Sequence, residues 1–329
     1  MMRLSKMKSL VEQQKINFKH LAMRVFDADR LVLSQSTAYQ VIAEFKQTRV
    51  RFYASENKRY KEPLVFTAPL AINMDIYDLY PYRSLIKHFQ ESGFDVYLID
   101  WGKLTYKNYQ VNFLSFIDKF IPRCIEAIQK HSKSEKISLH VGKLYKTLAY
   151  ITTRNPTIKD YVYNRLPKLM IHSPGFLNSL GFKLLDPKGW IDGNIQLLKN
   201  LDNLKLVQED ATLSHFLNNM IDYPGGINQD MLFNVWMQNP LKNGAITLKN
   251  KTIELKNIEC SLLVGAGKSD QLVTSEAAFP LTQLTNSQDV KFTLIPGGHL
   301  GLMSSQNSSI EFWPTLTTWL SERSTPIKR

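Results

Sequence analysis

Short apolar runs bounded by turn-forming residues recur along the chain and predict buried β-strands. A first strand is predicted at Thr48–Tyr53, where polar and apolar residues alternate. The continuous apolar runs are Leu64–Ala68, Asp95–Asp100, Ile137–Val141, Lys168–His172, Cys260–Gly265 and Lys291–Ile295. Apolar residues at helical spacing predict helices at Asp78–Gln90, Phe113–Lys130, Leu144–Thr153 and Ile310–Glu322. Strands that alternate with helices predict an α/β fold, with a mostly parallel central sheet and helices on both of its faces.

Two stretches depart from this alternation and divide the chain. Residues 1–47 show no strand alternation, and apolar residues such as Phe18, Leu21 and Val25 predict an N-terminal helical segment broken near Asp27–Asp29. Residues 176–248 look helical and carry no clear strand. We interpret this second stretch as a helical cap insertion, so residues 48–175 and 249–329 together would form the α/β core.

Composition limits the class of protein. The 329 residues are 43% hydrophobic, which allows a large core, and two cysteines exclude a disulfide framework. The N-terminus is basic, and we find neither a signal peptide nor an apolar run of about 20 residues, so we expect a soluble cytoplasmic protein without a transmembrane segment. The net charge of +12 favours acidic partners such as CoA phosphates, although a solvated basic surface is the simpler interpretation.

Some classes of ligand have no motif behind them. No zinc-knuckle, RNP or helix-turn-helix pattern accompanies the positive charge, so we expect no nucleic-acid binding. The histidines and cysteines show neither His-x-x-x-His nor Cys-x-x-Cys spacing, so we expect no metal site and no cofactor.

Two residues near the C-terminus have the order and position of an acid–histidine pair. Asp270 follows the predicted strand Cys260–Gly265, and His299 follows Lys291–Ile295 within a Pro-Gly-Gly-His sequence. In an α/β-hydrolase the nucleophile, the acid and the histidine occur in this chain order, each after a strand. Each residue alone could be an ordinary loop residue, but together they favour a catalytic pair in an α/β-hydrolase fold.

The nucleophile of such a site is missing. The turn after Ile137–Val141 has Lys143 at its centre, where a serine or cysteine is expected. A nucleophile elbow is a strained turn that needs small neighbours, but Val141 and Tyr145 stand on either side, followed by Lys146. We interpret Lys143 as an exposed or salt-bridged lysine, because a nucleophilic lysine requires strong desolvation or a cationic neighbour.

No other residue replaces the nucleophile convincingly. Ser138 lies within a predicted strand, and Thr147 lies about one turn into the following helix. Cys124 and Cys260 are interpreted as small core residues. Ser173 follows a predicted strand, but it comes one strand too late.

Several segments between residues 50 and 323 resemble the polyhydroxyalkanoate synthases, in particular the class III type with a short catalytic subunit. Asp78–Leu85 followed by Gly93–Gly102 carries most of the resemblance, and Gly297–Gly301 adds to it. Weaker matches are Pro69–Asn73, Asn200–Asp202, Ile253–Ile258, Asp270–Val273 and Trp319–Arg323.

The resemblance implies a chemistry that this chain has altered. Those synthases use a cysteine nucleophile with aspartate and histidine to polymerise 3-hydroxyacyl-CoA into polyester with release of CoA. The resemblance places the acid on Asp270, the histidine on His299 and the cysteine on Lys143. Three glycines of the family pattern fall on Val141, Tyr145 and Lys146, and the Asn73–Asp78 segment near the expected oxyanion loop is one residue short.

Two functional hypotheses follow. The first is a catalytically degenerate synthase homologue that acts as an accessory or regulatory subunit, as a homodimer or with an active synthase, at 3-hydroxyacyl-CoA or the polyester granule surface. The second is an enzyme in which Asp270 and His299 activate water for slow ester or thioester hydrolysis. Loss of oxyanion stabilisation opposes the second, because it costs about 100- to 1000-fold in rate.

Overall fold

The computed structural model describes residues 2–67, 72–141, 167–185, 187–237, 239–270 and 272–328. Five strands form one sheet in the order β1-β2-β4-β3-β5. Their bounds are Gln40–Phe45, Thr48–Tyr53, Leu64–Thr67, Val96–Asp100 and Ser138–Val141 for β1 to β5. β3 is parallel to both β4 and β5, whereas β2 is antiparallel to both β1 and β4. The sheet is therefore mixed, with its antiparallel part at the β1 edge.

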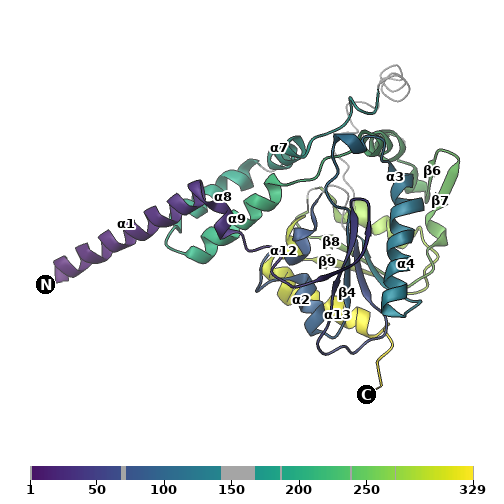
Figure 1. The fold of residues 1–329 in the computed structure, drawn as a ribbon, viewed down its shortest axis with the longest axis horizontal. Coiled ribbons are helices and arrows are strands. Elements are labelled where there is room, and N and C mark those ends of the chain that lie inside the picture. The colour runs from purple at the N-terminus through teal and green to yellow at the C-terminus, as the bar shows by residue number, and fades with distance from the viewer. Residues whose placement is uncertain are drawn as a thin grey trace.

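A second, parallel ladder carries the C-terminal strands β8 (Leu262–Gly267) and β9 (Val290–Ile295). Figure 1 shows helices on both sides of the strands, with α2 (Leu85–Glu91) and α13 (Trp313–Ser321) on one side and α4 (Ile121–Ser132) on the other. The shorter helices of the core are α3 (Phe113–Ser115), η4 (Phe116–Phe120), α11 (Ser275–Ala278), α12 (Gly301–Ser304) and η10 (Ser308–Phe312).

The ends of the core helices follow from local sequence. Ser84 begins α2, because its side chain accepts a hydrogen bond from the Lys87 amide. α4 has a proline in its first turn and ends at Ser132, because the next residue, Lys133, has a φ of 55° that stops the helix. β3 and β4 are buried along their whole length, which is why both are continuous apolar runs in the sequence.

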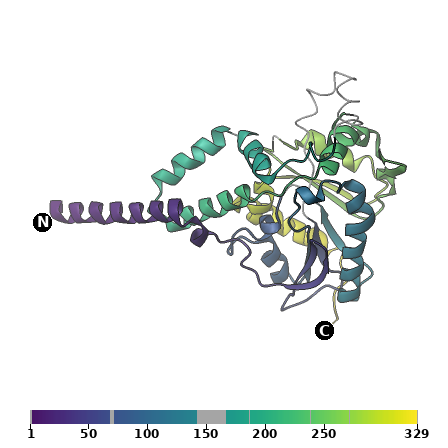
Figure 2. The ribbon, with the colours of Figure 1, turned by 45° about the horizontal axis from the view of Figure 1, so that its top comes forward.

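Helices outside the sheet form an elongated extension of the molecule. α1 (Met2–Phe26) projects away from the core, and α9 (Leu204–Asn218) lies against its C-terminal part (Figures 1 and 2). α7 (Gly175–Leu185) and α8 (Pro187–Lys199) precede α9, and α10 (Gly225–Gln229) with η6 (Asp230–Met237) follows it. None of the described helices is long and apolar enough to span a bilayer.

Three local predictions were wrong. Gln40–Phe45 forms strand β1, which pairs with β2, although no strand was predicted before residue 48. Lys168–His172 is a turn instead of a strand, with hydrogen bonds from the Met170 amide to Pro167 and from the His172 amide to Leu169. The predicted cap ends in a strand, β6 (Ala245–Leu248), which forms a hairpin with β7 (Lys251–Glu254). Backbone pairing with a neighbour decides such short segments more than their own sequence does.

Candidate functional site

Asp270 stands directly after β8, in a turn shaped by its own backbone. The Lys268 amide donates to the Ile295 carbonyl, and the Ser269 amide donates to the Gly297 carbonyl. The two loops after β8 and β9 are therefore joined by main-chain bonds. A glycine is required at Gly267, because a Cβ there would lie 2.8 Å from the Gly297 carbonyl oxygen.

His299 stands in the loop that follows β9. Gly297 turns the chain with a φ of 106°, which suits glycine and few other residues. The Ser308 hydroxyl donates to the Pro296 carbonyl over 2.9 Å and anchors the loop from the C-terminal side. α12 begins at Gly301, two residues after the histidine.

The two loops bring the acid and the histidine into contact. Nδ1 of His299 lies 2.9 Å from Oδ2 of Asp270. Oδ1 of Asp270 accepts hydrogen bonds from the amides of Leu272 and Val273, each over 2.9 Å. The Asp270 side chain is only 2% exposed, and that of His299 is 17% exposed. A carboxylate oxygen is an acceptor, so this contact places a proton on Nδ1 and fixes the tautomer with its lone pair on Nε2, as a general base requires.

The cap lies near this pair. The ring of Phe182 in α7 has its centroid 6.4 Å from that of the His299 imidazole. The two segments that connect α7 and α10 to the core are also joined, since Ser173 and Tyr223 exchange main-chain hydrogen bonds. α7 therefore places one aromatic ring beside the histidine.

The predicted nucleophile position lies outside the described residues. Lys143, Tyr145, Lys146 and Thr147 all fall in the 142–166 interval. The strand that leads to them is described, because β5 ends at Val141 opposite Thr67 of β3.

Other residues weighed as nucleophiles have structural roles. Ser138 begins β5, and its amide donates to the Pro63 carbonyl. The Ser173 hydroxyl donates to Oδ1 of Asn178 over 2.5 Å. Cys124 is fully buried on α4, as predicted, and burial raises the pKa of its thiol to about 12, which leaves it unreactive. Cys260 is exposed and lies just before β8, so its assignment to the core was wrong.

The described part of the expected oxyanion segment is occupied by structural hydrogen bonds. Asp78 accepts from both the amide and the hydroxyl of Thr37, and Asp75 accepts from the Gln35 amide group over 2.6 Å. Burial raises the pKa of the Asp75 carboxyl, and its hydrogen bond from Gln35 opposes that shift. These carboxylates hold residues 34–37 on the core.

A second histidine–aspartate contact, which was not predicted from the sequence, joins His172 and Asp222. Nε2 of His172 lies 3.0 Å from Oδ2 of Asp222, and the other oxygen of Asp222 accepts from the Gly175 amide over 2.7 Å. Together with the Ser173–Tyr223 pairing, this contact fastens the start of α7 to the segment after α9. Because its partners come together only when the cap folds back on itself, no spacing in the sequence could have indicated it.

Because Asp270 accepts several hydrogen bonds, its removal should lower the stability of the protein, whatever chemistry the pair performs. Asp270→Ala leaves two backbone amides and one imidazole without their acceptor, so we expect a loss of about 2 kcal/mol in the free energy of unfolding. Asp270→Asn keeps an acceptor oxygen and should recover most of this loss. Urea unfolding measures both, with the exposed Asp192→Ala as the matched control. Equal stability of Asp270→Ala and the control would contradict the assignment.

Comparisons with known proteins find relatives that are similar over most of the chain. The chain is 26% identical over 318 residues to the poly(3-hydroxyalkanoate) polymerase subunit PhaC of Haloferax mediterranei, covering 88% of this chain and 64% of that protein. It is 24% identical over 327 residues to the PhaC subunit of Allochromatium vinosum, covering 91% and 92%. The chain therefore spans under two thirds of the haloarchaeal relative and most of the bacterial one. No protein-family model matches the chain.

Solved structures agree on the fold. A monoglyceride lipase from Saccharomyces cerevisiae superposes with a TM-score of 0.50 at 13% identity, covering 89% of this chain and 97% of the lipase. A monoacylglycerol lipase from Paleococcus ferrophilus gives 0.50 at 14% identity, covering 84% and 99%. Identity at this level supports the fold alone, whereas the PhaC similarity runs through most of the chain. The protein thus has an α/β-hydrolase fold and is similar over most of its length to the PhaC poly(3-hydroxyalkanoate) polymerase subunits.

Proposed function

We propose that this protein is a catalytically degenerate homologue of the PhaC polymerase subunits that acts as an accessory or regulatory subunit in polyester synthesis. One observation carries the proposal: Lys143 stands where the resemblance places the nucleophilic cysteine. The flanking Val141, Tyr145 and Lys146 support it, because large side chains oppose the tight turn that presents a nucleophile. Without a nucleophile no acyl-enzyme forms, so chain growth on the protein itself has no starting point.

The surface of the cap supports the accessory role. α7 exposes Phe176 and Leu184, and α8 exposes Trp190, Ile191 and Leu198, each by more than half of its surface. Clustered apolar side chains of this size are typical of a protein or lipid interface. This surface would serve a homodimer, a heteromer with an active synthase, or contact with a polyester granule. A soluble, cytoplasmic location fits each of these roles.

The substrate class follows from the relatives and from the charge of the chain. PhaC subunits are named as poly(3-hydroxyalkanoate) polymerases, so 3-hydroxyacyl-CoA is the ligand to expect. The net charge of +12 would favour the phosphates of CoA. Binding of the thioester without turnover would suit a regulatory subunit.

A second function has its own supporting observation. The Asp270–His299 contact is intact, with the histidine tautomer suited to a base. Water activated by His299 could hydrolyse a thioester or ester slowly. Without a covalent nucleophile, however, only a small part of the acceleration of a complete triad is expected.

We expect the purified protein to release no CoA from 3-hydroxybutyryl-CoA above the level of its own His299→Ala variant. Release of CoA, followed by chromatography, measures this directly, and His131→Ala provides a remote histidine control on α4. Release that disappears only in His299→Ala would instead establish the hydrolytic alternative. A second arm adds the protein to an active PhaC subunit, where an accessory role predicts an altered rate of CoA release. No change in that rate would contradict the accessory role.

A further inference from the structure

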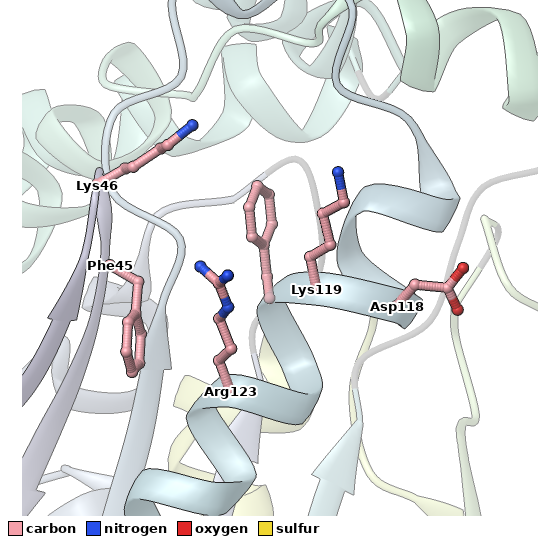
Figure 3. Close-up of a pocket in the computed structure, with 6 residues that line it drawn as sticks. Phe45, Lys46, Asp118, Lys119 and Arg123 are labelled. Carbon is pink, nitrogen blue, oxygen red and sulfur yellow. The ribbon is translucent and has the colours of Figure 1, made fainter.

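A hollow lies at the β1 edge of the five-stranded sheet, between the β1–β2 hairpin and the start of α4 (Figure 3). Its volume is about 330 Å³, within the range of small-molecule sites. Its lining residues are Phe45, Lys46, Asp118, Lys119, Phe120 and Arg123. The hairpin turn is held here by close packing, because a Cβ at Gly102 would lie 1.9 Å from the Gln47 carbonyl oxygen. Since Gly102 follows β4, the hollow lies at the carboxyl end of that strand.

The hollow has three cationic side chains and no free carboxylate. Within the described chain, no acidic group forms an ion pair with Lys46, Lys119 or Arg123. The single acidic lining residue, Asp118, is bound to Lys251 of β7 over 2.5 Å. In Figure 3 Arg123 lies between Lys46 and Lys119, whereas the Asp118 carboxylate points away from them. The local field is therefore positive, and it would concentrate an anion.

Aromatic side chains complete the lining. Phe45 and Phe120 are half-buried, and the ring of Phe120 packs edge-on against that of Phe116 at 5.2 Å between centroids. The helix that presents Lys119 and Phe120 is π-helical over Phe116–Phe120, a local deviation that occurs often at functional sites. Apolar rings beside unpaired cations fit a ligand that combines phosphate with a flat ring.

We propose that this hollow binds a nucleoside diphosphate group, either as a free nucleotide or as part of a larger cofactor such as CoA. The phosphates would contact Lys46, Lys119 and Arg123, and the base would lie against the phenyl rings of Phe45 and Phe120. Arg123 is suited to two parallel hydrogen bonds with a phosphate, and the lysines supply point charges. The site shares no residue with the Asp270–His299 pair and does not depend on the proposed function.

Titration calorimetry with ADP tests the proposal on the full-length protein. We expect Lys119→Ala and Arg123→Ala each to weaken ADP binding roughly tenfold, because each loses one charge-assisted contact. Lys130→Ala removes an exposed, unpaired cation at the far end of α4 and should leave ADP binding unchanged. Circular dichroism would establish that all three variants are folded.

Binding of CoA and of inorganic phosphate is compared with that of ADP. The first comparison tells a cofactor from a free nucleotide, and the second tests whether the phenyl rings take part. Tighter binding of CoA than of ADP, lost in the same variants, would identify the group as part of a cofactor, and weaker binding of CoA than of ADP would identify a free nucleotide. Inorganic phosphate should bind more weakly than ADP if the rings take part. The proposal is overturned if ADP and CoA both fail to bind, if phosphate binds as well as ADP, or if Lys130→Ala weakens binding as much as Lys119→Ala.

Discussion

Replacing Lys143 with cysteine alone should leave CoA release at background, whereas the same change together with glycine at positions 141, 145 and 146 should raise it roughly a thousandfold. The single variant supplies a thiol, but Val141 and Tyr145 remain beside it and oppose the tight turn of a nucleophile elbow. The fourfold variant restores the glycines that the resemblance places there. The thiol could then reach His299, whose tautomer Asp270 already fixes.

Chromatographic assay of CoA release from 3-hydroxybutyryl-CoA gives the result for both variants. Adding His299→Ala to the fourfold variant should return the rate to background, which separates catalysis by the pair from reaction of a free thiol. Activity in the single variant would mean that the elbow tolerates its large neighbours. A folded but inactive fourfold variant would contradict the prediction and direct attention to the shortened Asn73–Asp78 segment.

Removal of the Arg51 guanidinium should cost about 3–5 kcal/mol of the free energy of unfolding, the largest stability effect that we expect from one side chain. Arg51 of β2 donates from Nε and Nη2 to Oδ2 of Asp100, at 3.0 and 2.5 Å, and both side chains are 11% exposed. Within the described residues, Arg51→Ala would leave the buried Asp100 carboxylate with the Gly102 amide as its donor.

Two comparisons make the measurement by urea unfolding specific. The double variant Arg51→Met with Asp100→Leu removes both charges, so it should lose much less stability than Arg51→Ala. Lys15→Ala breaks an ion pair with Glu12 in which both side chains are 70% exposed, and it should change the stability by less than about 1 kcal/mol. Equal losses in Arg51→Ala and Lys15→Ala would show that burial of the Arg51 pair has no energetic weight.

Two of the strands that were predicted correctly, β3 and β4, owe their pattern to burial. Leu64–Thr67 and Val96–Asp100 are covered on both faces, so each is a continuous apolar run. Gln40–Phe45 is an edge strand with several exposed side chains, so its sequence lacks such a run, and pairing with β2 makes it a strand. The apolar run at Lys168–His172 was predicted to be a strand but forms a turn. Its residues Leu169 and Met170 are exposed.

Of the two candidate sites, one could be predicted from the sequence and the other could not. Chain order was enough to predict that Asp270 and His299 lie together, because each follows a strand and the two strands are parallel neighbours. The cationic hollow could not be predicted, since Lys46 comes from a hairpin turn and Lys119 and Arg123 come from a helix. Only the packing of the hairpin near that helix brings the three charges to one place.

The attachment of α1 also has a consequence for how the chain folds during synthesis. His20 lies 2.6 Å from the carbonyl of Leu201, and Arg24 donates to Asp210 and Ser214. His20 and Leu201 are 181 residues apart in the chain. The residues between them must therefore be synthesised before α1 can dock. At a translation rate of about 5–20 residues per second, this delay is on the order of 10 to 40 s. Throughout that interval the nascent chain exposes Leu21 and Met23, which docking packs against Leu201 and Val207, to chaperones and proteases, so docking of α1 marks a chain in which α9 has been completed.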